Sequence, residues 1–324
     1  MILLSSPIHS DAIQIATDFL QQGKLVAIPT ETVYGLGADA SNADAVAKIF
    51  VAKGRPSDHP LIVHLAYAAQ IKEWACNVPD SALVLAQAFW PGPLTLILPK
   101  GKSVPLQVTG GQGTIALRVP AHPIALWLLR TFGGGIAAPS ANRFGRISPT
   151  LASHVVEELD GAVDCILDGG PCVVGVESTI LDLTDRQPTI LRPGRITRSQ
   201  LEAVLQCDVG LKSQHKIRAP GMLAAHYAPQ TPALLCDRSL LIDEFDRLCA
   251  IGRRVGVLSF SAELAEWPCE YKRHLPGKPE DYESGLYHAL RELDKLPLDT
   301  ILVERPPVED TWLAVNDRLG KATV

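Results

Sequence analysis

Residues 25–56 read LVAIPTETVYGLGADASNADAVAKIFVAKGRP, and this stretch decides the fold class. Its first four residues form a short apolar run, which is typical of a buried strand. A helix is predicted over residues 41–53, because Ser41 or Asn42 can cap its start and Gly54 can end it. Between them lies a polar loop that contains glycine, at residues 29–37. A strand, a loop and a helix in this order indicate an α/β fold.

The same alternation continues along the chain. Apolar runs predict strands at residues 61–65, 94–98, 114–119 and 135–138, and longer amphipathic segments predict helices at 81–90 and 123–131. Ser148-Pro149 has the pattern of a helix N-cap followed by proline at the first helical position. Thr197 and Gln200 have the spacing of a capping box.

Hydrophobic periodicity weakens over residues 207–230, which contain two glycines and two prolines. We therefore predict a first domain at residues 1–206, a linker at 207–230 and a smaller domain at 231–324. The smaller domain has its own alternation and is predicted to be Rossmann-like, although no G-x-G-x-x-G follows its first strand. Its expected strands are 233–236, 254–260 and 300–303, and its expected helices are 240–249, 282–293 and 311–319.

Composition excludes several classes of protein. The 324 residues are 47% hydrophobic and 20% charged, which excludes a largely disordered chain, and the net charge of -5 excludes a basic nucleic-acid coat. The seven cysteines form no C-x-x-C pair, which argues against a disulfide framework or a structural zinc site. No apolar run reaches the roughly 20 residues of a membrane-spanning helix, and no secretory signal is visible. We expect a cytoplasmic protein with no membrane partner.

Acidic residues are absent from residues 81–156, although Asp and Glu number 35 in the whole chain. The bases of this window are Lys100, Lys102, Arg118, Arg130, Arg143 and Arg146. Two interpretations stay open. The window is either a buried apolar core with a few solvated bases, or a cleft kept free of carboxylates for an anionic ligand.

Loops of small and polar residues surround this window, at 29–37, 53–61, 139–142, 175–179 and 191–194. Open α/β sheets bind ligands where their strands end. Lys and Arg supply charge there, Ser and Thr supply hydroxyl donors, and Gly lets backbone N–H groups approach an oxyanion. The sequence has no Walker A motif, so a nucleotide would be held in another way.

These loops also carry recognisable motifs. They are PTETVYGLGAD at 29–39, KGRP at 53–56, RVP at 118–120, APSAN at 138–142, GVESTI at 175–180, LRPG at 191–194, PGM…HYAP at 220–229 and W…VNDRL…KA at 312–322. With them the chain resembles the YrdC-like threonylcarbamoyl-AMP synthases, in their longer two-domain form, over nearly its whole length. The family signature K-x-R…S-x-N is present as Lys53, Arg55, Ser140 and Asn142. The resemblance implies a YrdC-like open, twisted mixed sheet with helices, followed by a smaller Rossmann-like α/β domain.

The resemblance also implies an activity, in which ATP, L-threonine and bicarbonate or CO2 give threonylcarbamoyl-AMP and pyrophosphate. The product would serve a downstream transferase complex that makes threonylcarbamoyl-adenosine in tRNA. Mg²⁺ would enter with ATP, and no protein side chain is assigned to a metal. No stable nucleic-acid binding is expected of this chain itself.

Matching motifs assign the site residues one by one. Around ATP the resemblance places Lys53, Arg55, His59, Thr114, Ser140, Asn142, Ser148 and Arg192. Around threonine it places Thr32, His64, Arg118, Ala138 and Ser178, and the linker would close over the site with His226 and Tyr227. Lys53, Arg55 and Arg118 would act by position and charge, because this reaction needs neutralisation more than a covalent nucleophile.

The chain departs from the family pattern at two places. His59 stands where the family usually has Asn, so an imidazole nitrogen would replace that contact to ATP. Leu223-Ala-Ala225 stands where the linker usually carries a basic, aromatic stretch, which predicts weaker contacts from the linker to phosphate.

Two other functions would fit parts of this sequence. An RNA-binding module could use the acid-free window as a basic face, but the net charge of -5 and the 6% aromatic content disfavour it. Carbamoyl transfer in hydrogenase maturation uses a similar domain, but those proteins are much longer and carry C-x-x-C repeats. The oligomeric state and the choice between CO2 and bicarbonate stay open.

Replacing Arg55 or Arg192 by alanine should reduce ATP-dependent turnover by roughly 10- to 100-fold, because a charge-assisted hydrogen bond contributes about 1.5–3 kcal/mol. Steady-state kinetics of Arg55→Ala and Arg192→Ala measure this. An unchanged kcat/KM in either variant would remove that arginine from the site.

Overall fold

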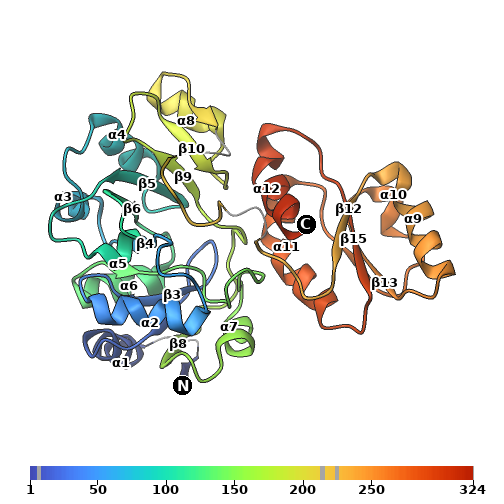
Figure 1. Ribbon diagram of the computed structural model, residues 1–324, viewed down its shortest axis with the longest axis horizontal. Helices are drawn as coiled ribbons and strands as arrows, with labels where there is room; N and C mark the ends of the chain where they lie inside the picture. Colours follow the sequence, from blue (N-terminus) through green and yellow to red (C-terminus); the bar gives the residue numbers. More distant parts are fainter. Residues whose placement is uncertain (6–8, 212–215, 223–225, 324) are drawn as a thin grey trace.

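Two sheets organise the chain, one in each half of the molecule (Figure 1). The computed structural model describes residues 1–5, 9–211, 216–222 and 226–323. The larger sheet has the strand order β1-β8-β2-β3-β7-β4-β6-β5-β9-β10-β11, and the smaller one the order β12-β15-β13-β14. Helices cover both sheets, so the predicted α/β class with a second, smaller α/β unit is confirmed.

The larger sheet mixes parallel and antiparallel pairs. For example, β2 runs parallel to β8 but antiparallel to β3, and β6 runs parallel to β4 but antiparallel to β5. Its strands are β1 (Ile2–Leu4), β2 (Val26–Ile28), β3 (Gly35–Asp39), β4 (Ile62–His64), β5 (Leu94–Pro99), β6 (Thr114–Arg118), β7 (Ile136–Ala137), β8 (Cys165–Leu167), β9 (Thr179–Asp182), β10 (Thr189–Arg192) and β11 (Gly210–Leu211).

Both faces of this sheet are buried. Along β6, Ile115 and Leu117 join the main hydrophobic cluster, whereas Ala116 between them joins a second cluster on the other face. The α-helices of this half are α1 (Ser10–Gln21), α2 (Ala43–Lys53), α3 (Ile71–Trp74), α4 (Asp80–Phe89), α5 (Leu106–Thr109), α6 (Pro123–Phe132), α7 (Ala152–Leu159) and α8 (Arg198–Leu205).

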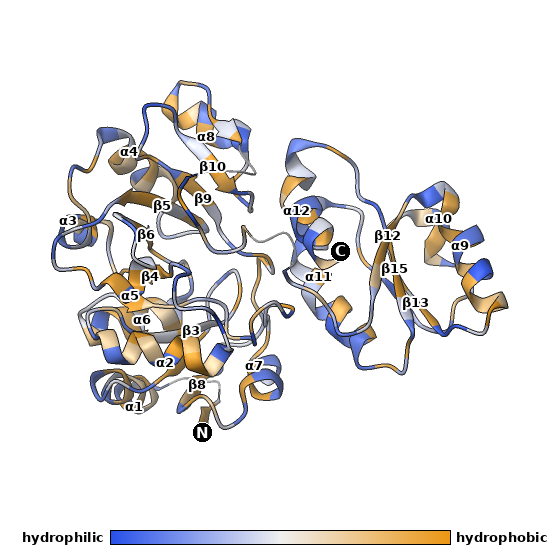
Figure 2. Ribbon diagram, in the orientation of Figure 1, coloured by the Kyte–Doolittle hydropathy of each residue, from blue (hydrophilic) through white to orange (hydrophobic). Residues whose placement is uncertain are grey.

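The smaller sheet is parallel throughout. Its strands are β12 (Ala233–Cys236), β13 (Val255–Ser259), β14 (Lys272–His274) and β15 (Thr300–Glu304). Helices α9 (Arg238–Ala250) and α10 (Ala262–Ala265) lie on one side of it, and α11 (Pro279–Asp294) and α12 (Leu313–Ala322) lie on the side that faces the larger half (Figure 1). Hydrophobic residues gather in the strands of both sheets (Figure 2).

Local sequence signals explain several element ends. The side chain of Asn42 accepts hydrogen bonds from the backbone N–H groups of Asp44 and Ala45, and Gly54 ends α2 in the left-handed region at φ +63°. The capping box of Thr197 and Gln200 is present at the start of α8.

Other local expectations were wrong. Strand β3 occupies residues 35–39 and so includes the last three residues of the predicted loop 29–37, and α1 and β8 were not predicted. Ser148-Pro149 does not begin a helix, since α7 begins at Ala152 and the Ser148 hydroxyl donates to Glu177 instead. Strand β11 pairs with β10 although it lies in the segment 207–230 that was predicted as a linker.

Ion pairs join α11 and α12 to the larger half. They are Arg146–Asp294, Arg195–Glu283, Arg291–Glu158, Lys295–Glu157 and Arg318–Glu177. No helix among the described residues is both long and apolar enough to cross a membrane.

Two leucines of α4 allow a matched test of the core. Leu85 is fully buried and Leu83 is 42% exposed. Leu85→Ala should lower the free energy of unfolding by about 2–5 kcal/mol, because it removes buried methyl groups and leaves a cavity. Leu83→Ala is the same substitution at an exposed position of the same helix. It should change the free energy of unfolding by no more than about 0.5 kcal/mol. Urea denaturation measures both, and equal losses would place the core elsewhere.

Candidate active site

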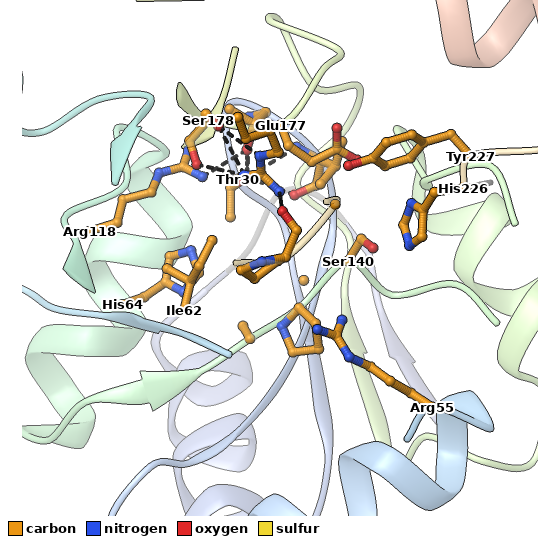
Figure 3. A pocket seen from close by; sticks show the side chains of 18 residues that line it. Thr30, Arg55, Ile62, His64, Arg118, Ser140, Glu177, Ser178, His226 and Tyr227 are labelled. Atoms are coloured by element: carbon orange, nitrogen blue, oxygen red, sulfur yellow. Dashed lines mark hydrogen bonds between the residues drawn. The ribbon is translucent and has the colours of Figure 1, made fainter. Parts of the chain in front are cut away.

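One pocket lies where the ends of several central strands meet the loops that carry the sequence motifs. It is lined from β3, β4, β6 and β10, from the loops after β2, α2 and β7, from the segment before β9, and from residues 220–221 and 226–227. Figure 3 shows the side chains around it, with Arg118 and His64 on the side opposite His226 and Tyr227. Segments far apart in the chain therefore converge on one space.

The residues predicted for threonine all line this pocket: Thr32, His64, Arg118, Ala138 and Ser178. Arg118 Nη1 donates to Thr32 Oγ1 at 3.0 Å, and Arg118 Nη2 lies 2.6 Å from a carboxylate oxygen of Glu31. Arg118 is 3% exposed, so its charge is balanced within the protein by Glu31, which sequence reasoning did not select.

His64 lies beside Arg118 on the neighbouring parallel strand, with the two residues in register. Burial and the nearby charge of Arg118 lower the pKa of the His64 imidazole to about 3. The ring is therefore neutral at ordinary pH, and it offers a hydrogen-bonding nitrogen rather than a second positive charge.

Among the residues predicted for ATP, Arg55, Ser140 and Arg192 line the same pocket. Arg55 Nη2 donates to the carbonyl of Pro60 at 3.0 Å, and its Nε has no partner among the described residues. Arg192 donates to the Ser178 carbonyl through Nε and Nη2, at 3.1 and 2.9 Å. Burial lowers the pKa of both guanidinium groups, that of Arg55 to about 10.

Lys53 stands behind the pocket instead of lining it. Its ammonium donates to the carbonyls of Ser140 and Asn142, and so it holds the APSAN loop against the end of α2. Burial and the charge of Arg55 lower the pKa of Lys53 well below its usual value. Asn142 is also outside the lining, since its side-chain amide donates to the carbonyls of Arg143 and Arg146.

The other predicted ATP residues lie outside the lining too. Ser148 is buried and donates to Glu177 at 2.5 Å. The His59 ring packs edge-on against Phe144 at 5.4 Å between centroids, and Thr114 begins β6. Of the six bases in the acid-free window, Arg118 is the one that lines the pocket, so most of that window is core with solvated bases.

Glu177 is the acidic residue of the pocket wall that sequence reasoning missed, although it stands inside the quoted GVESTI motif. Burial alone would raise the pKa of its carboxyl. The charges of Arg318 and Arg192 and the hydrogen bonds from Ser148 and Arg318 outweigh burial and lower this pKa to about 2. Glu177 is therefore ionised inside the pocket wall, and its main partner comes from the small domain.

His226 and Tyr227, which were predicted to close over the site, line one side of the pocket. Their rings meet edge-on at 4.1 Å, and Tyr227 adopts a left-handed backbone at φ +62°. A side chain at Gly221 would lie 2.2 Å from the Tyr227 hydroxyl, so only glycine fits there. The predicted departure at Leu223-Ala-Ala225 lies outside the described residues.

No group of three or more His, Cys, Asp or Glu residues that could hold a metal occurs in the part of the chain that the structure describes. In the Rossmann-like sheet, a carboxylate lies where β13 and β15 end. There Glu304 Oε2 accepts from the backbone N–H groups of Phe260 and Ser261, at 2.8 and 3.0 Å. The chain's own carboxylate thus occupies the amides that an anionic ligand would need.

The neutral state of His64 has a measurable consequence. Because the unfolded chain binds a proton that the folded imidazole does not, stability should fall as pH drops from about 6.5 toward about 3. His64→Gln should make this fall shallower by up to about 1.4 kcal/mol per pH unit, measured by urea denaturation between about pH 7 and pH 5. A His64 ring signal that titrates near pH 6.5 in the folded protein would contradict this assignment.

Known proteins match both halves of the chain. A family model described as "Telomere recombination" matches residues 18–194, and one described as "Threonylcarbamoyl-AMP synthase, C-terminal domain" matches residues 196–324. The threonylcarbamoyl-AMP synthase of Bacillus subtilis is 46% identical, over 95% of this chain and 91% of that protein. The protein of the same name from Pyrococcus abyssi is 43% identical, over 96% of this chain and 94% of its own length.

A solved structure agrees in fold over both domains. The crystal structure of P. abyssi Sua5 complexed with L-threonine superposes with a TM-score of 0.92, at 42% identity, over 99% of this chain and 97% of that one. Two family models together match nearly the whole chain, relatives at 43–46% identity cover 95–96% of it, and the chain belongs to the threonylcarbamoyl-AMP synthase family.

Proposed function

We propose that this enzyme joins L-threonine, bicarbonate or CO2, and ATP, and releases pyrophosphate and threonylcarbamoyl-AMP. One observation carries the proposal. Residues assigned to an amino acid (Thr32, Arg118, Ser178) and residues assigned to a nucleotide (Arg55, Arg192) line one pocket, in a chain that is 46% identical to a threonylcarbamoyl-AMP synthase. The RNA-binding alternative is not retained, because the near full-length relatives carry the name of an enzyme.

We propose L-threonine as the amino-acid substrate of this reaction. The P. abyssi structure of the same fold is described as complexed with L-threonine. Here the Arg118 guanidinium offers a planar fork of N–H donors, which suits a planar carboxylate. Its contact with Thr32 fixes the guanidinium in place, since Arg118 Nη1 donates to the hydroxyl of Thr32 at 3.0 Å.

The proposed chemistry has two steps. The neutral amine of threonine attacks CO2, forms a carbon–nitrogen bond and loses a proton, which gives a carbamate. A carbamate oxygen then attacks the α-phosphorus of ATP, and the bond to the pyrophosphate oxygen breaks. Negative charge is spread over the phosphates during this displacement, so catalysis depends on position and on nearby cations. Arg55 and Arg192 supply these cations, and Ser140 and Ser178 supply hydroxyl groups.

Water must be kept away from the carbamate, which it would decompose. The free volume of the pocket is about 40 Å³, which is too small for a nucleoside triphosphate. We therefore propose that His226 and Tyr227 move aside when ATP enters and then return over the bound substrates. The strained backbone of Tyr227 is consistent with a segment that changes conformation.

The remaining expectations are proposals as well. Mg²⁺ would arrive on the phosphates of ATP, because Glu177 already has partners for both of its carboxylate oxygens. The product would pass to a transferase complex that modifies tRNA. We expect these steps in the cytoplasm, since all seven cysteines are free thiols.

Incubation with ATP, L-threonine and labelled bicarbonate tests the function. We expect pyrophosphate release that depends on threonine, together with label in a threonylcarbamoyl-adenylate. Matched reactions with serine or without an amino acid serve as controls. Serine should be used less well by a modest factor, because one methyl group contributes about 1 kcal/mol. Pyrophosphate release that is independent of any amino acid, or none at all, would contradict the proposal.

A further inference from the structure

Arg318 is the bulkiest fully buried side chain among the described residues, and it belongs to the small domain. It lies on α12, yet its guanidinium reaches the wall of the pocket in the other domain. Nε donates to Glu177 Oε2 at 2.6 Å, and Nη2 donates to the Pro193 carbonyl at 3.0 Å. Its remaining nitrogen, Nη1, pairs with Asp317 at 2.5 Å. A buried cation of the small domain therefore contacts Glu177, a residue of the pocket wall, from outside the pocket.

Its partner, Glu177, is the sole acidic residue among the described residues that line the pocket. Besides Arg318, its carboxylate accepts from the Ser148 hydroxyl at 2.5 Å and from the Tyr287 hydroxyl at 3.0 Å. Ser148 and Tyr287 are neutral donors, so the full counter-charge in direct contact with this carboxylate comes from Arg318.

An uncompensated carboxylate would be harmful at this position. The nucleotide is an anion, and a negative charge in the same low-dielectric pocket would repel it. The carboxylate would also attract Arg192, whose charge acts on Glu177. Removing Arg318 therefore opposes nucleotide binding in two ways, by repulsion and by drawing away a cation that the phosphates need.

Arg318 also supports the segment that closes the pocket. Its guanidinium carbon lies 5.1 Å from the centroid of the Tyr227 ring. The backbone of the preceding His226 donates to the carbonyl of Lys321, on the same helix, at 3.1 Å. Helix α12 therefore contacts both Glu177 and the segment that covers it.

We propose that Arg318 is a positioning residue of the synthase reaction: it neutralises Glu177, so that Arg55 and Arg192 remain available for the anionic nucleotide. This inference rests on the proposed function. It assigns the small domain a direct part in nucleotide binding, through the charge of a side chain that does not touch the substrate.

Simple domain docking is the competing explanation, and Arg291 provides the matched control. Arg291 is also buried, lies on α11 and pairs across the same domain boundary, with Glu158 at 3.1 Å. It does not line the pocket. Arg291 also donates to the backbone carbonyls of Ile147 and Ser148, but it makes no contact with the Glu177 carboxylate. A substitution of Arg291 should therefore weaken docking without leaving Glu177 unpaired.

The experiment compares the full chain with Arg318→Gln, Arg318→Lys, Glu177→Gln/Arg318→Gln and Arg291→Gln. ATP affinity is measured by calorimetry without threonine, and the KM values for ATP and threonine by pyrophosphate release. Thermal unfolding shows which variants are folded. Arg318→Lys keeps the charge and loses the fork, and the double variant removes both charges, so either one tests the proposal if Arg318→Gln does not fold.

We expect Arg318→Gln to raise the KM for ATP about tenfold or more, and the KM for threonine by less than about threefold. Arg318→Lys and the double variant should stay within about threefold of the unchanged chain in ATP affinity, because neither leaves a lone carboxylate. Arg291→Gln should lower the melting temperature and leave ATP affinity within about twofold.

Equal loss of ATP affinity in Arg318→Gln and Arg291→Gln would overturn the proposal in favour of docking. Failure of the double variant to recover ATP affinity would also overturn it. So would a loss of ATP affinity of more than about threefold in Arg318→Lys. An unchanged chain that binds no ATP would instead refute the proposed function. The two failures are thus distinguishable.

Discussion

Burying three arginines around one small pocket is unfavourable, because each guanidinium loses hydration and repels the others. Arg55, Arg118 and Arg192 are at most 8% exposed. The protein offsets part of this cost with carbonyl acceptors for Arg55 and Arg192 and with the Glu31 carboxylate for Arg118. A surplus of positive charge remains, which an anionic ligand would neutralise. The surrounding loops and strands hold the three arginines in place.

The two domains share this task. The large domain brings Arg118 and Arg192 together at the ends of β6 and β10, beside Arg55, which follows α2. The small domain contributes the Arg318 charge that balances Glu177. At the strand ends of the small domain, Glu304 already accepts from the backbone N–H groups of Phe260 and Ser261. The Rossmann-like sheet of this domain presents α11 and α12 to the pocket domain, as Figure 1 shows.

Sequence patterns correctly predicted those elements whose ends depend on residues nearby in the chain. Helix α2 was expected at 41–53 and occupies Ala43–Lys53, because its cap and its terminal glycine are local signals. The proline after Ser148 misled the prediction, since the hydroxyl of that serine is used by Glu177, far along the chain. Strand β3 was missed because its sequence, GLGAD, has little strand propensity and pairs only in the context of the sheet.

In the candidate site, too, local motifs were predicted and contacts between distant residues were not. Motifs identified Thr32, Arg55 and Arg192, which the structure brings to one pocket. They did not reveal that Lys53 holds carbonyl groups behind that pocket. The pairing of Glu177 with Arg318 joins residues 141 positions apart, and no periodicity or spacing in one sequence connects them.

A crystal structure of this chain with L-threonine and a non-hydrolysable ATP analogue tests the central claim most directly. The account predicts the triphosphate against Arg55 and Arg192, threonine beside Thr32 and Arg118, and Glu177 still paired with Arg318. A nucleotide bound at the strand ends of the small domain, or phosphates that touch neither Arg55 nor Arg192, would contradict it.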